Sequence, residues 1–480
     1  MPSERPDEMT ADNPTPRIHR NLADLYADSD RAERVAEIAR LIEEKRVKHV
    51  YFQYVTMQGR VMAKVIPGTF WAQAATKGLT WPYTISGGLH ATREGEVMGE
   101  GGGTTLEGLI LPDLTTFDIF PWADGSMARV FCTNYRRLDE EERPGEIATQ
   151  DVRALLAVTL EDFYDATRVI PRSGCEPEMS WFKSRDQIDT SSSLYPSWVS
   201  PGYSVRHLES MRPVLQKVTD YGSRMGFEMI QADYEDPNQL EANFQFDGFM
   251  KTADRVITYR QICMQVADEL GMVATFMPKP ISGIMANGLH HHVSFWRDGE
   301  NLFVDPSKKS RANLTDEGRH AIGGILNHSR GMQALVGPTV NSYKRFLDAN
   351  WSPTDVSWGY DNRLCSIRAL DGRFEVRMPD SSANPYLSHL AILTAIRDGW
   401  ENKTDPGPNR LGEGPADAAY PKLPVTLAEA LDAFEEDEVI SGMLPPDLRD
   451  LFVTAKRDEW MRFCGAITDW DFATYLNYTP

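Results

Sequence analysis

The sequence predicts an α+β protein with a small N-terminal domain and a larger domain of mixed helices and strands. Near its start, a helical pattern is followed by a strand, a turn and a second strand. A polar, acidic stretch at residues 136–146 ends this region, and strand-like and helical segments alternate beyond it. The 480 residues are 41% hydrophobic and 25% charged, which is enough apolar material for a large core.

The N-terminal elements follow from local patterns. Residues 1–17 are rich in Pro, Asp, Glu, Asn and Thr without apolar periodicity, so we expect a disordered tail. A helix is expected from Ser29, because apolar residues then recur on one helical face. The β-rich runs 49–55 and 61–66 are predicted strands joined by a turn at Gly59, and 109–112 and 128–132 are two more.

A glycine-rich segment covers residues 87–103. It lacks the Lys-Ser/Thr pair of a P-loop and does not lead from a strand into a clear helix. We therefore expect a flexible active-site or interface loop and not a phosphate cradle.

The larger domain is predicted to begin with an amphipathic helix at 149–166. Residues 204–221 carry apolar residues at helical spacing. Asn384-Pro385 is typical of a helix start, and Thr426 with Glu429 forms a capping-box pattern. Between these two, residues 406–424 are predicted to form a Pro- and Gly-rich loop.

Charge and cysteine content exclude several classes of partner. The net charge is −20, from 50 basic and 70 acidic residues, and such a surface repels nucleic acid and anionic membranes. No apolar run approaches the roughly 20 residues that span a bilayer, and the first residues lack a signal-peptide core. The five scattered cysteines contain no CxxC pair, so we expect a cytoplasmic protein.

Three segments place polar side chains, potential metal ligands among them, two residues apart, which puts these side chains on one face of a strand. They are Glu176 with Glu178; His290, His292 and Ser294, with His291 on the opposite face; and Arg373, Glu375 and Arg377. A fourth acidic segment contains Asp233 and Glu241. Carboxylates with imidazole and no thiolate favour Mg²⁺ or Mn²⁺ over structural Zn²⁺. Each segment alone is more often a solvated strand face or a salt-bridge ladder, but here the polar rows alternate with apolar residues.

Basic residues are concentrated between positions 343 and 377 of this acidic chain. Arginine beside a carboxylate metal site suits anionic substrates, and divalent ions with arginine are the electrostatic parts of phosphoryl transfer. Interface salt bridges are the ordinary alternative.

The chain resembles glutamine synthetases and the related glutamate–amine ligases over almost its whole length. The matching motifs come in family order: Gly59, Leu111-Pro112-Asp113, Phe120-Pro121-Trp122, Glu176-Pro177-Glu178, Gln239-Leu240-Glu241, Met277 to Pro280, His290 to Ser294, Asn341 to Arg345, Asn362-Arg363, Glu375 to Asp380 and Ala383 to Tyr386. Any one motif is weak, but so many in order are a strong signal.

The resemblance implies a β-grasp N-terminal domain at 18–143 and an α/β catalytic domain with a curved antiparallel sheet at 144–480. It also implies a homo-oligomer, a dodecamer with active sites between subunits. Two to three Mg²⁺ or Mn²⁺ ions and ATP would serve each site.

Residue roles carry over from the family in the same way. The metal ligands would be Glu178, Asp233 and Glu241 at one site, and Glu176, His290 and Glu375 at the other. ATP would contact Glu228, His292, Ser294, Arg368 and Arg373. Glutamate would contact Asn287, Gly288, His290, Arg345 and Arg377. Arg363, Arg345 and Asp233 would be catalytic.

Three departures from the family pattern concern ammonium. Thr56 and Trp351 stand where carboxylates would hold and deprotonate NH₄⁺, and Asp233 stands in place of a longer Glu. A buried cation without counter-charges is costly, whereas an indole offers an apolar wall for an organic substituent. Thr56 and Trp351 are therefore the predicted amine pocket. The displaced Asn287-Gly288 pair is a fourth departure, at the glutamate α-amino end.

The predicted function is ATP-dependent ligation of L-glutamate to an alkyl or aromatic amine through γ-glutamyl phosphate, which would serve amine catabolism and nitrogen metabolism. Monoamines are favoured over polyamines, because the predicted pocket offers no second carboxylate. The alternatives are a glutamine synthetase that uses ammonium, and a catalytically silent scaffold on the same fold.

Overall fold

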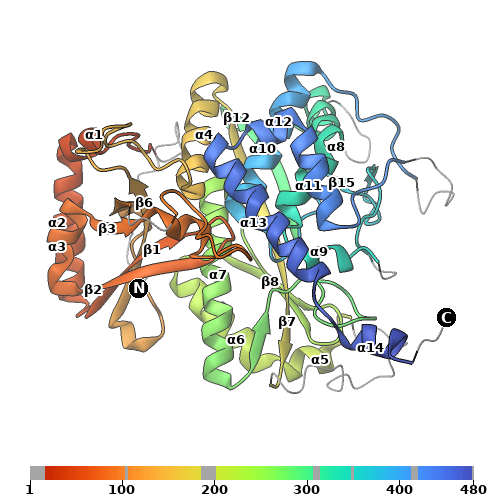
Figure 1. Ribbon diagram of the computed structural model, residues 1–480, viewed down its shortest axis with the longest axis horizontal. Helices are drawn as coiled ribbons and strands as arrows, with labels where there is room; N and C mark the ends of the chain where they lie inside the picture. The colour runs from red at the N-terminus through yellow and green to blue at the C-terminus, as the bar shows by residue number, and fades with distance from the viewer. Residues whose placement is uncertain are drawn as a thin grey trace.

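Two β-sheets, one in each half of the chain, organise the computed structural model (Figure 1). The structure describes residues 17–102, 106–184, 202–305, 307, 314–347, 351–411 and 420–477. The predicted tail, except Arg17, and the middle of the predicted 406–424 loop lie outside these residues. The expected α+β class is confirmed.

The N-terminal sheet has the strand order β2-β1-β6-β4-β3, with β5 paired to β6. Its strands are β1 (His49–Val55), β2 (Val61–Pro67), β3 (Leu79–Pro82), β4 (Glu107–Pro112), β5 (Asp118–Ile119) and β6 (Met127–Tyr135). Its helices are α1 (Leu22–Ala27), α2 (Ser29–Glu44) and α3 (Trp71–Lys77). Val35 and Ile42 of α2 pack with Phe52 and Trp71 in its core. The four strands predicted here and the helix start at Ser29 are confirmed.

The larger sheet has ten strands in the order β14-β15-β16-β12-β7-β9-β8, with three short strands attached to β7 and β12. The main strands are β7 (Ile170–Phe182), β8 (Met229–Tyr234), β9 (Gln239–Phe244), β12 (Leu289–Arg297), β14 (Trp358–Tyr360), β15 (Ile367–Leu370) and β16 (Arg373–Val376). The short ones are β10 (Asp247–Gly248), β11 (Val273–Thr275) and β13 (Glu300–Asn301). Apart from the parallel β14–β15 pair, the described pairings are antiparallel.

Helices cover this sheet and extend beyond it. They are α4 (Val152–Thr167), α5 (Val205–Ser210), α6 (Arg212–Arg224), α7 (Phe249–Leu270), α8 (Asp316–Val336), α9 (Val340–Lys344), α10 (Pro385–Asn402), α11 (Leu427–Glu436), α12 (Glu438–Gly442), α13 (Pro446–Cys464) and α14 (Asp469–Tyr475). Asn384 caps α10 and Thr426 caps α11, as predicted. The helix predicted at 204–221 is instead two helices, because the first one ends before Met211 and Pro213 lies in the first turn of the second.

The glycine-rich segment folds back as a short hairpin, with Ala91 bridged to Val97. Arg462 donates to the carbonyl of Ala91 at 3.0 Å, and Asp458 accepts from the backbone of Arg93 at 3.0 Å. The loop is therefore held against α13 of the same chain.

A buried ion network joins the two halves. Arg153 of α4 donates to Asp113, at the end of β4, and to Asp254 of α7, each at 2.8 Å. The Tyr386 hydroxyl donates to Asp254 at 2.7 Å. This network fixes the N-terminal sheet against the helices of the second half. The domain boundary at residue 143 stays a prediction.

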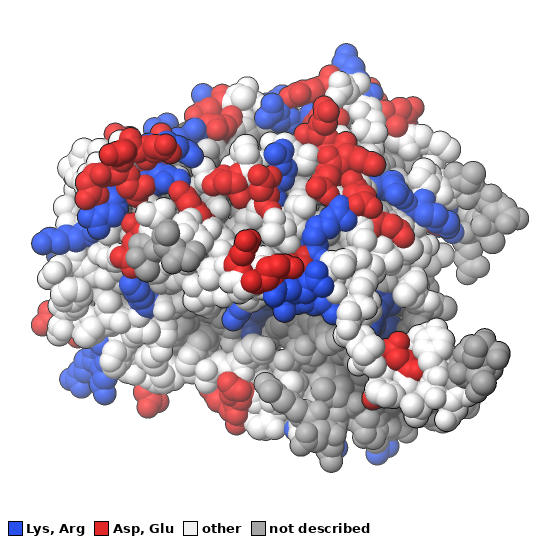
Figure 2. All heavy atoms as spheres, in the orientation of Figure 1, with Lys and Arg blue, Asp and Glu red and all other residues white. Residues whose placement is uncertain are grey.

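Charges of both signs are interspersed over the upper part of the face drawn in Figure 2. None of the described helices is long and apolar enough to cross a membrane.

A histidine flanked by two carboxylates ties three helices together. His328 of α8 contacts Asp437, the N-cap of α12, at 2.8 Å and Asp398 of α10 at 3.0 Å. Burial lowers the pKa of His328, but the two carboxylates outweigh this effect and raise it above its ordinary value. The imidazolium form is therefore favoured in the folded protein.

Replacing His328 by Asn should lower the free energy of unfolding by about 2 kcal/mol at pH 6. Because the folded pKa is raised, the contribution of His328 is fully present below its unfolded pKa and is lost as pH rises through the folded value. Denaturant unfolding at pH 6 and pH 9 should show a smaller difference from wild type at pH 9. His320→Asn, on the same helix without a carboxylate partner among the described contacts, is the matched control. A deficit for His328→Asn that is equal at both pH values would contradict this prediction.

Candidate active site

The candidate site occupies one face of the large sheet, opposite the helical core. Val293 and Phe295 of β12 and Phe374 of β16 point into the core packed on α8 and α10. Strand alternation then turns His290, His292 and Glu375 to the other face. His291 points to the core side, where it contacts Ser388 of α10 at 2.8 Å. The predicted alternation is confirmed.

Antiparallel register brings the first group of ligands together. His290 lies opposite Glu176, and His292 opposite Glu375. His290 Nδ1 is 3.2 Å from Glu176 and 3.3 Å from Glu375, and His292 Nε2 is 2.8 Å from Glu176. Glu176, His292 and Glu375 offer ligand atoms within 4.8 Å of one another. These distant segments therefore lie together in the fold, and their roles as metal ligands stay predictions.

Each group differs from the predicted ligands by one residue: His292 stands in the first group instead of His290, and Glu235 in the second instead of Asp233. Glu178 lies opposite Glu241, and Glu235 joins them with all three carboxylates within 4.8 Å. Asp233 also lies opposite Glu241 but belongs to neither group. Asn238, with a φ of 67°, forms a tight turn between β8 and β9 that brings Glu235 beside Glu241. The sequence pattern did not identify Glu235, because the length of this turn determines which acidic residue faces the site.

The second group carries excess negative charge. Burial and the nearby Glu235 raise the pKa of Glu178 to about 8. Burial and neighbouring carboxylates also raise the pKa values of Glu235 and Glu241. These groups would ionise fully only with a cation between them, so the donor set fits a divalent metal ion.

The first group is closer to charge balance. Burial opposes ionisation of Glu176, but hydrogen bonds from His290 and His292 outweigh it and hold its pKa below the ordinary value. Burial lowers the pKa of His290 to about 4, so its imidazole is neutral near pH 7. A neutral imidazole has the lone pair that a metal ion requires.

Gly288 makes room for these contacts. A β-carbon there would lie 2.6 Å from His290 Nε2 and 3.1 Å from Arg345 Nη2. The backbone N–H of Gly288 donates to Glu178 at 2.6 Å. A side chain at this position would displace both the imidazole and the arginine.

Arginines surround the first group. Arg368 donates to Glu375 at 3.2 Å, and Arg377 donates to the same carboxylate. Arg373 Nε lies 3.1 Å from His292 Nδ1. Arg345 is 2% exposed and lies 3.4 Å from His290 Nε2. Cations next to carboxylates and imidazoles form a site for phosphate and carboxylate groups.

Two further aromatic residues border the site, and sequence patterns did not single them out. The hydroxyl of Tyr203 donates to Glu235 at 3.3 Å, and the charge of Arg363 offsets part of the rise in the pKa of Glu235. Trp296 donates its indole N–H to the hydroxyl of Ser294 at 2.9 Å. The Tyr203 contact joins residues 32 positions apart, which spacing along the sequence does not reveal, whereas the i, i+2 spacing of Trp296 and Ser294 on one strand was a signal that could have found Trp296.

In the described structure, the other predicted site residues do not contact the two ligand groups directly. Glu228 is exposed, and no described contact joins it to the other predicted ATP residues. The amide of Asn287 is fully buried and bonded to Ser180 and to the carbonyl of Met277, so it faces the protein and not a ligand. Thr56, in the β1–β2 turn, is fully buried, and its hydroxyl accepts from the backbone of Arg60 at 3.2 Å.

Trp351 lies six residues after Arg345, and its side chain is 53% exposed. No described contact joins it to Thr56 within one chain. The described part of the chain therefore does not bring the two residues of the predicted amine pocket together.

A third cluster, of Cys175, His291 and His389, lies on the core side of the sheet. Each imidazole nitrogen there already has a hydrogen-bond partner. It is a packed polar contact between β7, β12 and α10.

Residues 149–475 match the family model described as glutamine synthetase, catalytic domain. The chain is 31% identical to a glutamate–methylamine ligase of Methyloversatilis universalis, covering 92% of this chain and 99% of that protein. It is 32% identical to a glutamine synthetase of Methanocaldococcus jannaschii, covering 92% and 98%. A solved structure described as a GmaS/ADP complex superposes with a TM-score of 0.80 at 29% identity, covering 92% of this chain and 99% of that one.

The geometry predicts that Glu235→Gln weakens Mn²⁺ binding at least tenfold, because a carboxylate among three is lost. Asp233→Asn, which removes a nearby charge but no grouped ligand, should weaken it by less than threefold. Calorimetric titration of Mn²⁺ into each protein at pH 7.5 measures the two effects without turnover. A larger loss of Mn²⁺ affinity in Asp233→Asn than in Glu235→Gln would instead identify Asp233 as the metal ligand.

Proposed function

Because the chain belongs to the glutamine synthetase family, we propose that it is an ATP-dependent ligase joining L-glutamate to an organic amine. The family match and the glutamate–methylamine ligase relative support carbon–nitrogen ligation. The exposed side chain of Trp351 is the observation that favours an organic amine over ammonium as the substrate. A protein that binds NH₄⁺ would be expected to have a carboxylate at this position.

The reaction has two chemical steps. The γ-carboxylate of glutamate attacks the γ-phosphorus of ATP, which forms γ-glutamyl phosphate and releases ADP. The neutral amine then attacks the acyl carbon, phosphate leaves, and the amide nitrogen loses its proton. Two to three Mg²⁺ or Mn²⁺ ions would neutralise the phosphate oxygens when bound.

The chain's own residues supply binding and orientation. We assign one metal position to Glu176, His290 and Glu375, and the other to Glu178, Glu235 and Glu241. Arg363, Arg368 and Arg373 would hold the triphosphate, with His292 and Ser294 beside it. Arg345 and Arg377 would hold the glutamate carboxylates, because their guanidinium groups lie next to the metal ligands.

We propose that Asp233 takes the proton that the amine must lose. Its carboxylate accepts a hydrogen bond from the Gln231 amide at 3.1 Å. Burial and the nearby Glu176 raise its pKa, which favours proton acceptance.

ATP and glutamate as substrates suit the cytoplasm, as do five cysteines without a disulfide. Fixing an amine as an amide makes its nitrogen non-basic, which suits amine catabolism.

A phosphate-release assay with ATP, Mg²⁺ and glutamate tests the choice of amine. We expect kcat/KM for the best of methylamine, ethylamine and benzylamine to exceed that for ammonium at least tenfold, since the pocket wall is apolar. Trp351→Glu should shift this ratio toward ammonium by tenfold or more, whereas the matched Trp351→Phe should keep it. Ammonium as the best substrate of the wild type would instead identify a glutamine synthetase, and the absence of turnover with every amine would indicate a silent scaffold.

We also propose a homo-oligomer, a dodecamer with active sites between subunits. The C-terminal arm, residues 465–477, carries α14 away from the body of the chain (Figure 1). Its apolar side chains face solvent, with Ile467 74%, Trp470 64% and Leu476 69% exposed. Such an apolar surface is typical of a contact between copies.

Deleting residues 465–480 should reduce the mass of the assembly at least twofold, because the arm's apolar surface loses its partner. Light scattering measures the mass, and the triple substitution of Ile467, Trp470 and Leu476 by Ser should have the same effect. Substituting exposed Leu89, Val97 and Leu106 of the N-terminal half by Ser is the matched control. An unchanged mass in both arm variants would reject a role for the arm in assembly.

A further inference from the structure

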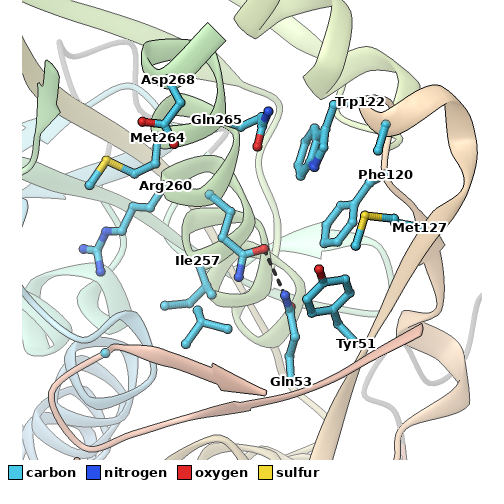
Figure 3. Close-up of a pocket in the computed structure, with 14 residues that line it drawn as sticks. Tyr51, Gln53, Phe120, Trp122, Met127, Ile257, Arg260, Met264, Gln265 and Asp268 are labelled. Atoms are coloured by element: carbon cyan, nitrogen blue, oxygen red, sulfur yellow. Dashed lines mark hydrogen bonds between the residues drawn. The ribbon is translucent and has the colours of Figure 1, made fainter. Parts of the chain in front are cut away.

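A groove of about 730 Å³ lies between the N-terminal sheet and α7, and none of the candidate active-site residues lines it (Figure 3). Tyr51, Phe120, Trp122 and Met127 form its N-terminal-domain side. The other side is one face of α7, with residues at helical spacing: Ile257, Arg260, Gln261, Met264, Gln265 and Asp268.

The aromatic side is rigidly built. Phe120 and Trp122 stack with ring centroids 4.4 Å apart, and Tyr51 meets Phe120 edge-on at 5.9 Å. Trp122 also packs on Tyr221 at 5.6 Å. Aromatic faces carry partial negative charge, so this wall accepts either an apolar body or a cation.

Gln53, which also lines the groove, has a buried hydrogen-bond acceptor without a described donor. Gln53 is 4% exposed, and its amide N–H donates to Gln261 at 3.3 Å. Its Oε1 atom has no partner among the described residues, although it is buried. A buried acceptor of this kind is costly unless a donor meets it.

The end of the groove nearest the last turn of α7 is negative. Asp268 and Glu269 both lie at the helix C-terminus, where the helix dipole is also negative, and that turn contains no basic residue. Lys217 neutralises Glu269 at 2.6 Å, but Asp268 has no ion pair with any described residue. This combination favours a bound cation at Asp268.

The positive charge of Arg260 does not cancel the preference for a cation at Asp268. It lies two turns from Asp268, which is about 12 Å along the helix. Its guanidinium donates to the carbonyls of Ser381 and Ala383, each at 2.8 Å. In Figure 3 it points away from the aromatic side.

We propose that this groove is a second binding site, separate from the active site, for a primary alkyl- or arylalkylammonium ion. The ammonium group lies at the Asp268 end, and the apolar body lies along Trp122, Phe120 and Met127. At the far end, Gln53 Oε1 accepts from a water that enters with the ligand. The volume of about 730 Å³ favours a monoamine with a body of several carbons over methylammonium.

Calorimetry with 2-phenylethylammonium chloride tests the site in the full-length protein without ATP, metal or glutamate. We expect saturable binding to wild type, and binding about fivefold weaker to Asp268→Asn, as expected for a partly exposed ion pair with a cation–π contact. Trp122→Leu should weaken binding similarly, and Trp122→Phe should restore most of it. Asp24→Asn, a charge removal on the exposed face of α1, is the matched control and should bind as wild type does. The neutral analogue 2-phenylethanol should bind at least fivefold more weakly than the ammonium ion.

Three results would overturn the proposal. Loss of binding in Trp351→Ala with full binding in Asp268→Asn would place the amine in the active site. Equal binding of 2-phenylethanol would remove the argument from charge. No binding to wild type, with a change of assembly mass in Trp122→Leu, would make the groove a contact between copies. The experiment does not involve turnover, so failure of the proposed ligase activity would leave its result unaffected.

Discussion

The active-site geometry depends on the antiparallel pairing of β7 with β9 and β12, and of β12 with β16. In these strands one face carries Val293, Phe295 and Phe374 into the core, and the other carries acids, histidines and arginines. The hydrophobic requirement of the core fixes the register, because a shift of one residue would exchange the two faces. The same register then places Glu176 beside His290 and Glu178 beside Glu241.

This arrangement concentrates negative charge in a buried place, and the surrounding residues limit its cost in two ways. In the first group, His290 and His292 donate to Glu176, while Arg368 and Arg377 donate to Glu375. In the second group there is less compensation, so the pKa of Glu178 is raised to about 8. The second group is therefore the one in which a cation would change both charge state and stability most.

The N-terminal half has two roles in this arrangement. Asp113 accepts from Arg153 of the larger half, which also donates to Asp254. Asn384 donates to the backbone carbonyls of Thr56 and Met57, each at 3.1 Å. These bonds bury Thr56 within its own chain, so any contribution of the β1–β2 turn to a neighbouring site would come from residues around Thr56. The same docking leaves a groove against α7, because the aromatic side chains of the N-terminal half do not fill the space beside that helix.

Local pattern determined most of the fold: the α+β class, the strand pair at Gly59, the caps of α10 and α11, and the strand faces that carry Glu176, His290 and Glu375. These features depend on periodicity and on backbone preferences, which act over a few residues. The tertiary structure decided which acid completes the second group, because the tight turn at Asn238 brings Glu235, and not Asp233, to Glu178. It also decided that the Asn287 amide bonds to Ser180 and Met277, and that Asp268 and Trp122 border one groove. Each of these outcomes depends on distances between segments far apart in the chain, and residue spacing carries no information about such distances.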